Sequence, residues 1–556
     1  MPFIVSTGPP GAKQIDKRTR KLIRSHVMIG RNMGRALPKR ASKTTDSSEA
    51  RARDSQAQSE TDQHKCTKAK RSCKTRRSVA RQRSETQTAL ARTVFGILLT
   101  SHIPRKVRTD LSLIQCADRT VEPSTVLVVL RFSSIAERAL YTLEPCVQFD
   151  KPDRRWLEPI GHDAVFLHTM ISTAEDYFML LTGSRAHGTS SPDPRVTGRE
   201  LAHLSKALRL LRERLIRAEQ EEGLSDDTIC AILCIATTAR GFGDYEAAFA
   251  HMLGLRKIVD LRGGIAGLRG SGKLLIDLFR CDLGMALDTG SPPTFFNDPS
   301  VEPFISYPTT SLSDIFLPRQ LAKLPSELTV PSHISNPSLA SSLGTIAPEL
   351  SEAWIALSSF CTAIHVAEAL GQKLPKDLML DTMAAVTYRL IALSSTFAPG
   401  SLDELVRVGL LVFSANVFLQ WLDLKLPFYF LPRLLRDVLM AGRPEGCSWE
   451  LWIWFLSVGA ISVFDVETED RLGEALGQAM EGCELGAREK WEWDGNRGVR
   501  SLLREFMWIG LLYEKHARKV FEVVTEREMM RAGFWWKRQG AMVTACGMDG
   551  TQLGLA

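Results

Sequence analysis

The stretch LSDDTICAILCIATTARGFGDYEAAFAHMLGLRKIVDLRGG, residues 224–264, predicts two consecutive amphipathic helices and with them the class of the fold. Ser225 is placed to cap the first helix, and Asp226 and Asp227 follow in its first turn, where carboxylates favour the positive end of the helix dipole. Gly263 and Gly264 end the second helix, as glycine commonly does. The apolar face that we expect for this second helix comprises Phe249, Met252, Leu255, Ile258 and Val259.

The same pattern continues on both sides of this stretch. Residues 200–222 place leucines at spacings of three and four: Leu201, Leu204, Leu208, Leu211 and Leu215. Further helical patterns cover residues 273–287, 350–371, 376–395, 403–423, 448–464 and 498–524. Short loops between successive amphipathic helices imply antiparallel packing around a shared core. We therefore predict an all-α fold, with one large helical domain of packed antiparallel helices.

Composition divides the chain into segments. The first 85 residues are polar and poor in large apolar side chains, which predicts a disordered basic arm. The β-branched segment STVLVVLRF (124–132) favours a short isolated strand. Nine prolines between Pro292 and Pro337 predict a long excursion from the helical domain. The expected divisions are the arm 1–85, a transition region 86–160 with a short helix near 86–99, the helical domain 161–530 with its Pro/Ser-rich excursion 289–345, and a C-terminal tail 531–556.

Charge separates the arm from the body. Residues 1–92 hold 23 Lys and Arg against 7 Asp and Glu, a net charge of +16. The remaining residues hold 47 basic and 56 acidic side chains, a net charge of −9. This asymmetry predicts a nucleic-acid, import-receptor or acidic-surface partner for the arm. The alternative is a solvated tail without a partner.

The densest basic run surrounds two cysteines in CTKAKRSCKTRR (66–77). A two-zinc cluster needs six thiolates, and here Gln63 stands where the first is expected, while the next cysteine after Cys73 is Cys116. His64 with Cys66 and Cys73 supplies three ligands and no closed site, so we expect no metal and no cofactor. Without a metal site, we expect the basic side chains of this run to serve as a nuclear-import signal or to contact phosphates. They are Lys65, Lys68, Lys70, Arg71, Lys74, Arg76 and Arg77.

Catalytic patterns are incomplete throughout the sequence. GLRGSGKL (267–274) begins like a phosphate-binding loop, but Leu274 replaces the magnesium-binding Ser or Thr, and a helix precedes it rather than a strand, so we interpret it as an inter-helix loop. The eleven histidines form no metal-binding pair, and His251 is expected to pack or bond within its helix. Clustered tryptophans indicate core packing, with a ligand pocket as the alternative: Trp449, Trp452, Trp454, Trp535 and Trp536. We predict that the chain is not an enzyme.

Cysteine usage and hydropathy predict the compartment. The eleven cysteines include no C-x-x-C pair, and Cys230, Cys234, Cys281 and Cys361 lie in apolar helical patterns, which favours a reducing compartment. The apolar run at 408–422 is shorter than the ~20 residues that a membrane span needs and contains Asn416 and Gln420. We expect a soluble intracellular protein without a membrane partner.

Two stretches resemble a known family. The block 225–296 resembles the helical regulatory (middle-homology) domain of fungal-specific transcription factors, in which a His-Met-x-Gly-Leu helix ends in Leu-Arg-Gly-Gly and an Asp-x-x-x-Ala helix follows, as at Asp282 to Ala286. The amino terminus resembles a subgroup with a Ser-His-Val-Met motif and no complete zinc cluster. The matching residues are Ser25, His26, Val27 and Met28, and His251, Met252, Gly254, Leu255, Leu261, Arg262, Gly263 and Gly264.

The resemblance implies nuclear localisation and a regulatory role in transcription. Family members that bind DNA usually do so through the zinc cluster that this sequence lacks. We therefore expect the helical body to contact transcription-related proteins or a small ligand, and the arm to contact a nuclear import receptor and, non-specifically, DNA. The alternative is a helical interaction or scaffold protein that keeps the fold without acting on transcription.

Overall fold

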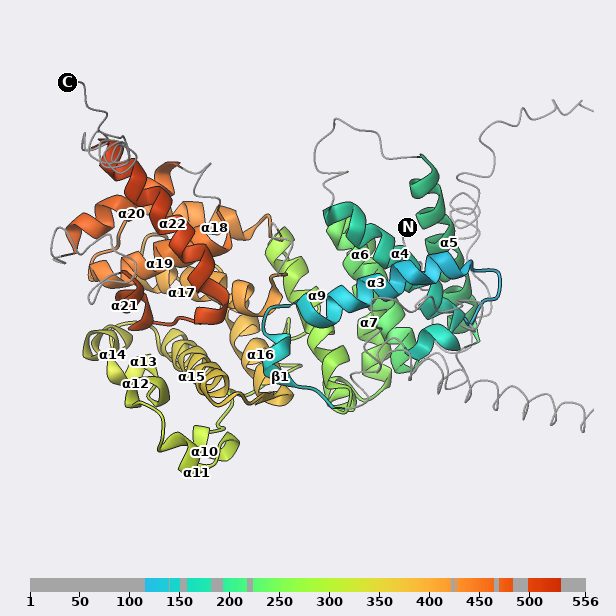
Figure 1. Cartoon of the computed structure of the whole chain (residues 1–556), viewed down its shortest axis with the longest axis horizontal. Coiled ribbons are helices and arrows are strands. Elements are labelled where there is room, and N and C mark those ends of the chain that lie inside the picture. Colours follow the sequence, from blue (N-terminus) through green and yellow to red (C-terminus); the bar gives the residue numbers. More distant parts are fainter. Residues whose placement is uncertain are drawn as a thin grey trace, which may run out of the picture. The chain divides into compact units, whose positions relative to one another are not determined.

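The structure is a computed structural model that describes residues 116–139, 141–150, 158–181, 194–217, 224–421, 426, 428–464, 470–483 and 499–531. All of them belong to the unit Cys116–Ala556. Twenty α-helices lie within this described part of the chain, with one pair of two-residue strands (Figure 1). The prediction of an all-α fold is therefore confirmed.

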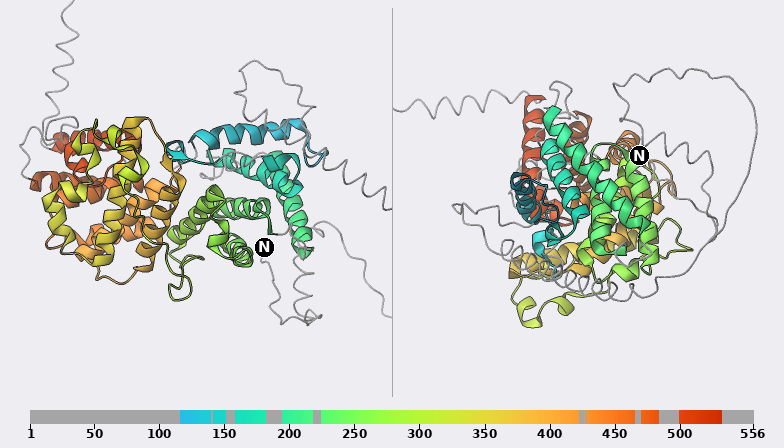
Figure 2. Two further views of the ribbon diagram at one scale, coloured as in Figure 1. Left: turned by 90° about the horizontal axis from the view of Figure 1, so that it is seen from below. Right: turned by 90° about the vertical axis from the view of Figure 1, so that its right-hand side faces the viewer.

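The amino-terminal helices of this unit pack around α4 (Ala164–Leu181) and α6 (Asp226–Gly241). Helix α4 contacts α3, α5 and α6, and α6 contacts α7 and α9 (Figure 2). Ser225 caps α6 by accepting a hydrogen bond from the Thr228 backbone N–H at 3.2 Å, as predicted. The other helices of this group are α3 (Pro123–Ala139), α5 (Pro194–Ile216), α7 (Tyr245–Leu261), α8 (Ile265–Leu268) and α9 (Gly272–Thr289), with the 3-10 turns η2 (Glu144–Cys146) and η4 (Glu158–Gly161).

Helix α9 connects these elements to the following ones, because it contacts α16 (Lys376–Ala392) and the π-helical turn η6 (Ala415–Leu419). Helix α16 packs between α15 (Pro348–Leu370) and α17 (Leu402–Ser414), and α17 packs on α19 (Trp449–Ser462). The remaining elements are α18 (Leu431–Ala441), α20 (Asp470–Gly482), α21 (Val499–Arg504) and α22 (Gly510–Arg531), and the parallel strands β1 (Val147–Gln148) and β2 (Leu374–Pro375).

The segment 124–132 is not a strand, and that prediction is wrong. It lies within α3, whose Val126, Val129 and Phe132 are buried at a spacing of three residues while Leu127 is 44% exposed. Helix α3 packs against α4. This tertiary contact outweighs the weak intrinsic preference of β-branched residues for strands.

Several predicted helices have different limits or different faces. The pattern at 498–524 is two helices, α21 and α22, separated by buried residues at 506–509, and the pattern at 403–423 ends as α17 plus η6. Phe249, which the sequence pattern predicts on the buried face of α7, is 42% exposed, and Leu201 in α5 is 58% exposed. The first position of a regular apolar stripe need not meet a neighbour, which periodicity alone does not reveal.

The excursion 289–345 contains short helices rather than continuous irregular chain. Its turns α12 and α13 contact α15 (Figure 1). The five helices are α10 (Leu312–Ile315), α11 (Pro318–Leu321), α12 (Ser326–Thr329), α13 (Ser332–Ser335) and α14 (Pro337–Leu343). Proline stands at the first position of α11 and α14. It fits there because a backbone N–H at this position has no hydrogen-bond partner within the helix, so its absence costs nothing.

Hydropathy singles out α15. Among the described residues it is the one helix long and apolar enough to cross a membrane, and 61% of its apolar window is buried within the fold. Burial of this kind also characterises a core helix. The apolar run at 408–422 begins inside α17, where Val408, Leu410 and Leu411 are at most 2% exposed.

Candidate functional site

The residues of α7 on which the resemblance rests divide into buried and exposed ones. His251 is 7% exposed, and Met252 and Leu255 are fully buried, whereas Leu261 is 72% exposed. Burial lowers the pKa of His251 to about 4, so its imidazole is neutral at pH 7. Gly254 has no atom within 4 Å of the position that a Cβ would take. The packed part of the motif is thus the turn that contains His251, Met252 and Leu255.

The Leu-Arg-Gly-Gly turn at the end of α7 joins three helix ends. Arg262 and Ser271 both bond to the carboxylate of Asp226, which lies in the first turn of α6, while Ser271 directly precedes α9. Gly263 and Gly264 have φ angles of +90° and +75°, a region that strains any residue with a Cβ. The motif residues therefore fix the relative positions of α6, α7 and α9.

Asp282 in α9 organises the loop that follows this helix. Its buried carboxylate accepts hydrogen bonds from the backbone N–H of Thr294 at 2.7 Å, the backbone N–H of Phe295 at 3.0 Å and the hydroxyl of Tyr388 at 2.9 Å. Burial raises the pKa of Asp282, and these donors oppose the rise. Asp282 thus connects the loop after α9 to α16.

Arg256 and Glu302 hold the same loop from the side of α7. Arg256 Nη1 donates to Glu302 Oε2 at 2.6 Å, and its guanidinium lies 5.1 Å from the centroid of the Phe295 ring. Glu302 also accepts the backbone N–H of Phe296 at 2.7 Å. Phe296 has a φ of +53°, rare for a residue with a side chain, and its ring lies 4.8 Å from that of Tyr388. The loop is held in a strained conformation by these contacts.

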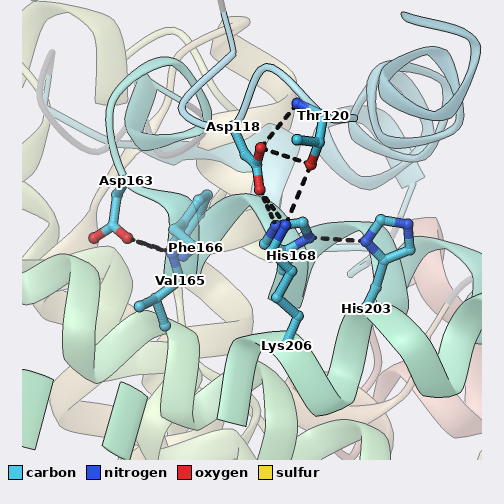
Figure 3. A network of polar contacts seen from close by, with 8 residues as sticks. All are labelled: Asp118, Thr120, Asp163, Val165, Phe166, His168, His203 and Lys206. Atoms are coloured by element: carbon cyan, nitrogen blue, oxygen red, sulfur yellow. Dashed lines mark hydrogen bonds and ion pairs between the residues drawn. The ribbon is translucent and has the colours of Figure 1, made fainter. Parts of the chain in front are cut away.

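A second polar cluster, which we call the histidine network, joins residues 116–120 to α4 and α5. Figure 3 shows His168 between Asp118 and His203. His168 Nε2 lies 3.1 Å from Asp118 Oδ2, and its Nδ1 lies 2.8 Å from His203 Nδ1. Lys206 bonds to the same Asp118 oxygen, and Thr120 donates its N–H and its hydroxyl to the other. His168 is 1% exposed, so these contacts anchor the segment that begins the described chain.

One arrangement of protons satisfies both contacts of His168. A neutral His168 that donates Nε2–H to Asp118 has a bare Nδ1, which accepts the Nδ1–H of His203. Burial lowers the pKa of His168, while the bond from Lys206 holds the pKa of Asp118 well below its usual range. Sequence reasoning did not find this cluster, because 50 and 35 residues separate His168 from its two partners.

Only residues 269–271 of the Gly-rich stretch 267–274 lie between helices, so the inter-helix loop that the sequence predicts is shorter than expected. Residues 265–268 form α8 and Gly272 begins α9. Lys273 pairs with Asp277 at 2.7 Å and with Glu144 at 2.9 Å, so internal carboxylates already neutralise the cation that a phosphate would need. Glu144 also pairs with the buried Arg280 at 2.5 Å. These ion pairs attach η2 to α9.

Two of the tryptophans in the predicted cluster, Trp452 and Trp454, pack in the interior. Trp454 is 1% exposed and donates its Nε1–H to the Met507 carbonyl oxygen at 2.8 Å. Trp452 is 5% exposed and stacks on Phe455, and the half-buried Trp449 lies beneath the Arg443 guanidinium at 4.1 Å. The core-packing interpretation is confirmed for Trp452 and Trp454, whereas Trp449 is only partly buried.

Other candidates lie outside the described residues. These are the basic run from Lys65 to Arg77, the motif from Ser25 to Met28, Cys66 with Cys73, and Trp535 with Trp536. Within the described part of the chain, no three His, Cys, Asp or Glu side chains converge in a metal-binding arrangement. No family model, no curated protein and no solved structure matches the chain.

Proposed function

We propose that the chain is a fungal transcriptional regulator without catalytic activity. Its helical body contacts proteins or a small ligand, and its basic arm provides nuclear import and non-specific DNA contact. The observation that carries this proposal is the division of charge, +16 in residues 1–92 against −9 in the remainder. A cationic segment attached to an anionic body favours phosphate or import-receptor binding by the arm alone, because the body repels the same partners.

The polar side chains of block 225–296 hold neighbouring elements of the fold together. Arg262, Asp282 and Arg256 are each engaged with carboxylates or donors of neighbouring elements. The outer side of α7 instead presents Phe249 and Leu253, four residues apart and 42% and 44% exposed. Residues four apart lie side by side on a helix, and we assign this pair as the contact of the body with another protein.

The nuclear part of the proposal is tested by the location of a fluorescent fusion of the full chain. We expect the fusion in the nucleus and expect it to become cytoplasmic when glutamine replaces the seven cations Lys65, Lys68, Lys70, Arg71, Lys74, Arg76 and Arg77. A matched control removes seven other arm cations: Lys13, Lys17, Arg18, Arg20, Lys21, Arg24 and Arg31. The control should stay nuclear, and an unmodified fusion that remains cytoplasmic contradicts the proposal.

The second candidate function is a scaffold protein that does not act on genes. The exposed pair Phe249 and Leu253 favours it as much as it favours a regulator. Recovery of partners from separate nuclear and cytoplasmic extracts distinguishes the two. Partners found only in the cytoplasmic extract, and lost when both residues are changed to serine, support the scaffold.

A further inference from the structure

One face of α7 is exposed, while the rest of the helix packs against α6 and α9. The exposed residues recur every three or four positions, so they lie side by side along the helix. They are Glu246, Phe249, Leu253, Lys257 and Asp260. We call this set the α7 face. With a rise of 1.5 Å per residue, it is a straight stripe about 21 Å long.

The α7 face has apolar side chains in its middle and opposite charges on either side of them. Glu246 precedes the apolar pair, and Lys257 follows it. Within the described part of the chain, neither Glu246 nor Lys257 takes part in an ion pair. Asp260 instead pairs with Arg256 of the same helix at 3.0 Å. The charges of Glu246 and Lys257 are therefore available to a second molecule.

The order of residues on the α7 face makes it complementary to itself. A symmetric dimer uses the same patch on both subunits, so residue i contacts residue j and j contacts i. A two-fold axis beside residues 251 and 252, in the middle of the face, runs two α7 helices antiparallel. It brings Phe249 of each copy against Leu253 of the other. The same axis brings Glu246 of each copy against Lys257 of the other, so attraction at both ends fixes the register.

We propose that the α7 face binds a second copy of this chain, as an antiparallel pair of α7 helices about a two-fold axis. The proposal rests on the assignment, under the proposed function, of Phe249 and Leu253 as the contact of the body with another protein, and it names that protein. One helix per subunit gives an interface at the low end of the size range, below about 1,200 Å². We therefore expect a dimer that forms as the concentration rises, rather than a permanent one.

The test is sedimentation equilibrium of the full chain over a wide range of concentrations, at about 0.15 M salt, where charges within about 8 Å still interact. Glu246→Lys sets lysine against lysine at both ends of the interface, and Lys257→Glu sets glutamate against glutamate. Each reversal turns two exposed attractive pairs into repulsive ones, so each should weaken the dimer by roughly tenfold. The double variant with both reversals restores both attractive pairs and should regain the parental dissociation constant.

A mixture of the two single variants gives a second, independent readout. In a heterodimer of Glu246→Lys with Lys257→Glu, lysine faces glutamate at both ends, so this species should form more tightly than either variant does alone. The variant with serine at both Phe249 and Leu253 should stay monomeric. As a matched control, Leu201→Ser replaces an exposed leucine of α5 and should leave the dimer unchanged.

A parent chain that stays monomeric at every concentration overturns the proposal and leaves the α7 face to a different protein. A double variant that dimerises no more tightly than the single variants also overturns it. If Glu246→Lys fails to fold because it places a cation in the first turn of α7, as judged by circular dichroism, then Lys257→Glu and the serine variant decide the outcome. These results are separate from the location of the fluorescent fusion: a cytoplasmic fusion contradicts the role in transcription, and a monomeric chain contradicts only the dimer.

Discussion

Removal of the Asp282 carboxylate should strongly lower the stability of the helical body. In the Asp282→Ala variant three donors lose their acceptor: the Thr294 and Phe295 backbone N–H groups and the Tyr388 hydroxyl. All three lie in or beside the buried core. Each buried donor left without a partner costs about 1–3 kcal/mol, so the loss of the acceptor for three donors should lower the free energy of unfolding by roughly 3–9 kcal/mol.

A double-mutant cycle separates this effect from the loss of side-chain volume. Tyr388→Phe removes one donor while Asp282 keeps two, and it should cost about 1–2 kcal/mol. In the Asp282→Ala background the hydroxyl has no acceptor, so the same change should cost almost nothing. The coupling energy should therefore be about 1–2 kcal/mol.

Urea unfolding at pH 7, followed by circular dichroism and tryptophan fluorescence, measures these values. Thr387→Val is the matched control on the same helix, because the buried Thr387 hydroxyl has no hydrogen-bond partner, and we expect it to be neutral or stabilising. Additivity of Asp282→Ala and Tyr388→Phe within about 0.3 kcal/mol would refute the assigned role of Asp282.

Three further predictions concern the motif helix and the histidine network. Gly264→Ala should destabilise the chain by about 1–2 kcal/mol because φ is +75° there. Gly254→Ala, with open space at the position of the Cβ, should stabilise it by about 0.5–1 kcal/mol. The urea midpoints of the two variants measure these changes. His251, with a pKa lowered to about 4, stays unprotonated in the folded chain while the unfolded chain takes up a proton below pH 6.5. Stability should thus fall by roughly 3 kcal/mol between pH 6.5 and pH 4, and a His251→Leu variant with an unchanged pH profile would contradict this. Asp118→Asn should leave His168 and Lys206 without their carboxylate and speed amide hydrogen exchange at residues 117–120, while exchange in α19 stays unchanged.

The sequence predicts those elements whose pattern is local. Ser225, Gly263 and Gly264 mark helix ends by their chemistry, and the structure places the ends there. The strand expected at 124–132 is wrong because burial of α3 against α4 decides its conformation. The break in 498–524 arises where Phe506, Met507, Trp508 and Ile509 are buried consecutively, which a periodic pattern does not predict.

Local sequence patterns do not predict the polar clusters, because these clusters join residues that are far apart in the sequence. Asp282 and Tyr388 are 106 positions apart, and Asp118 and Lys206 are 88 apart. The sequence pattern singles out Asp282, through the Asp-x-x-x-Ala stretch, but it gives no sign of its partner Tyr388. The exposed position of Phe249 likewise depends on which neighbours α7 has, and those are set by the tertiary packing.

The central claim is that the arm, and not the body, binds nucleic acid through charge. Fluorescence anisotropy of random duplex DNA with the full chain, at two salt concentrations, tests it most directly. We expect binding that weakens steeply with salt, and we expect the glutamine variant of the seven cations from Lys65 to Arg77 to lower the slope of log K against log salt by up to about 6. Absence of binding by the unmodified chain, or binding by the variant with the same salt slope, would contradict the account.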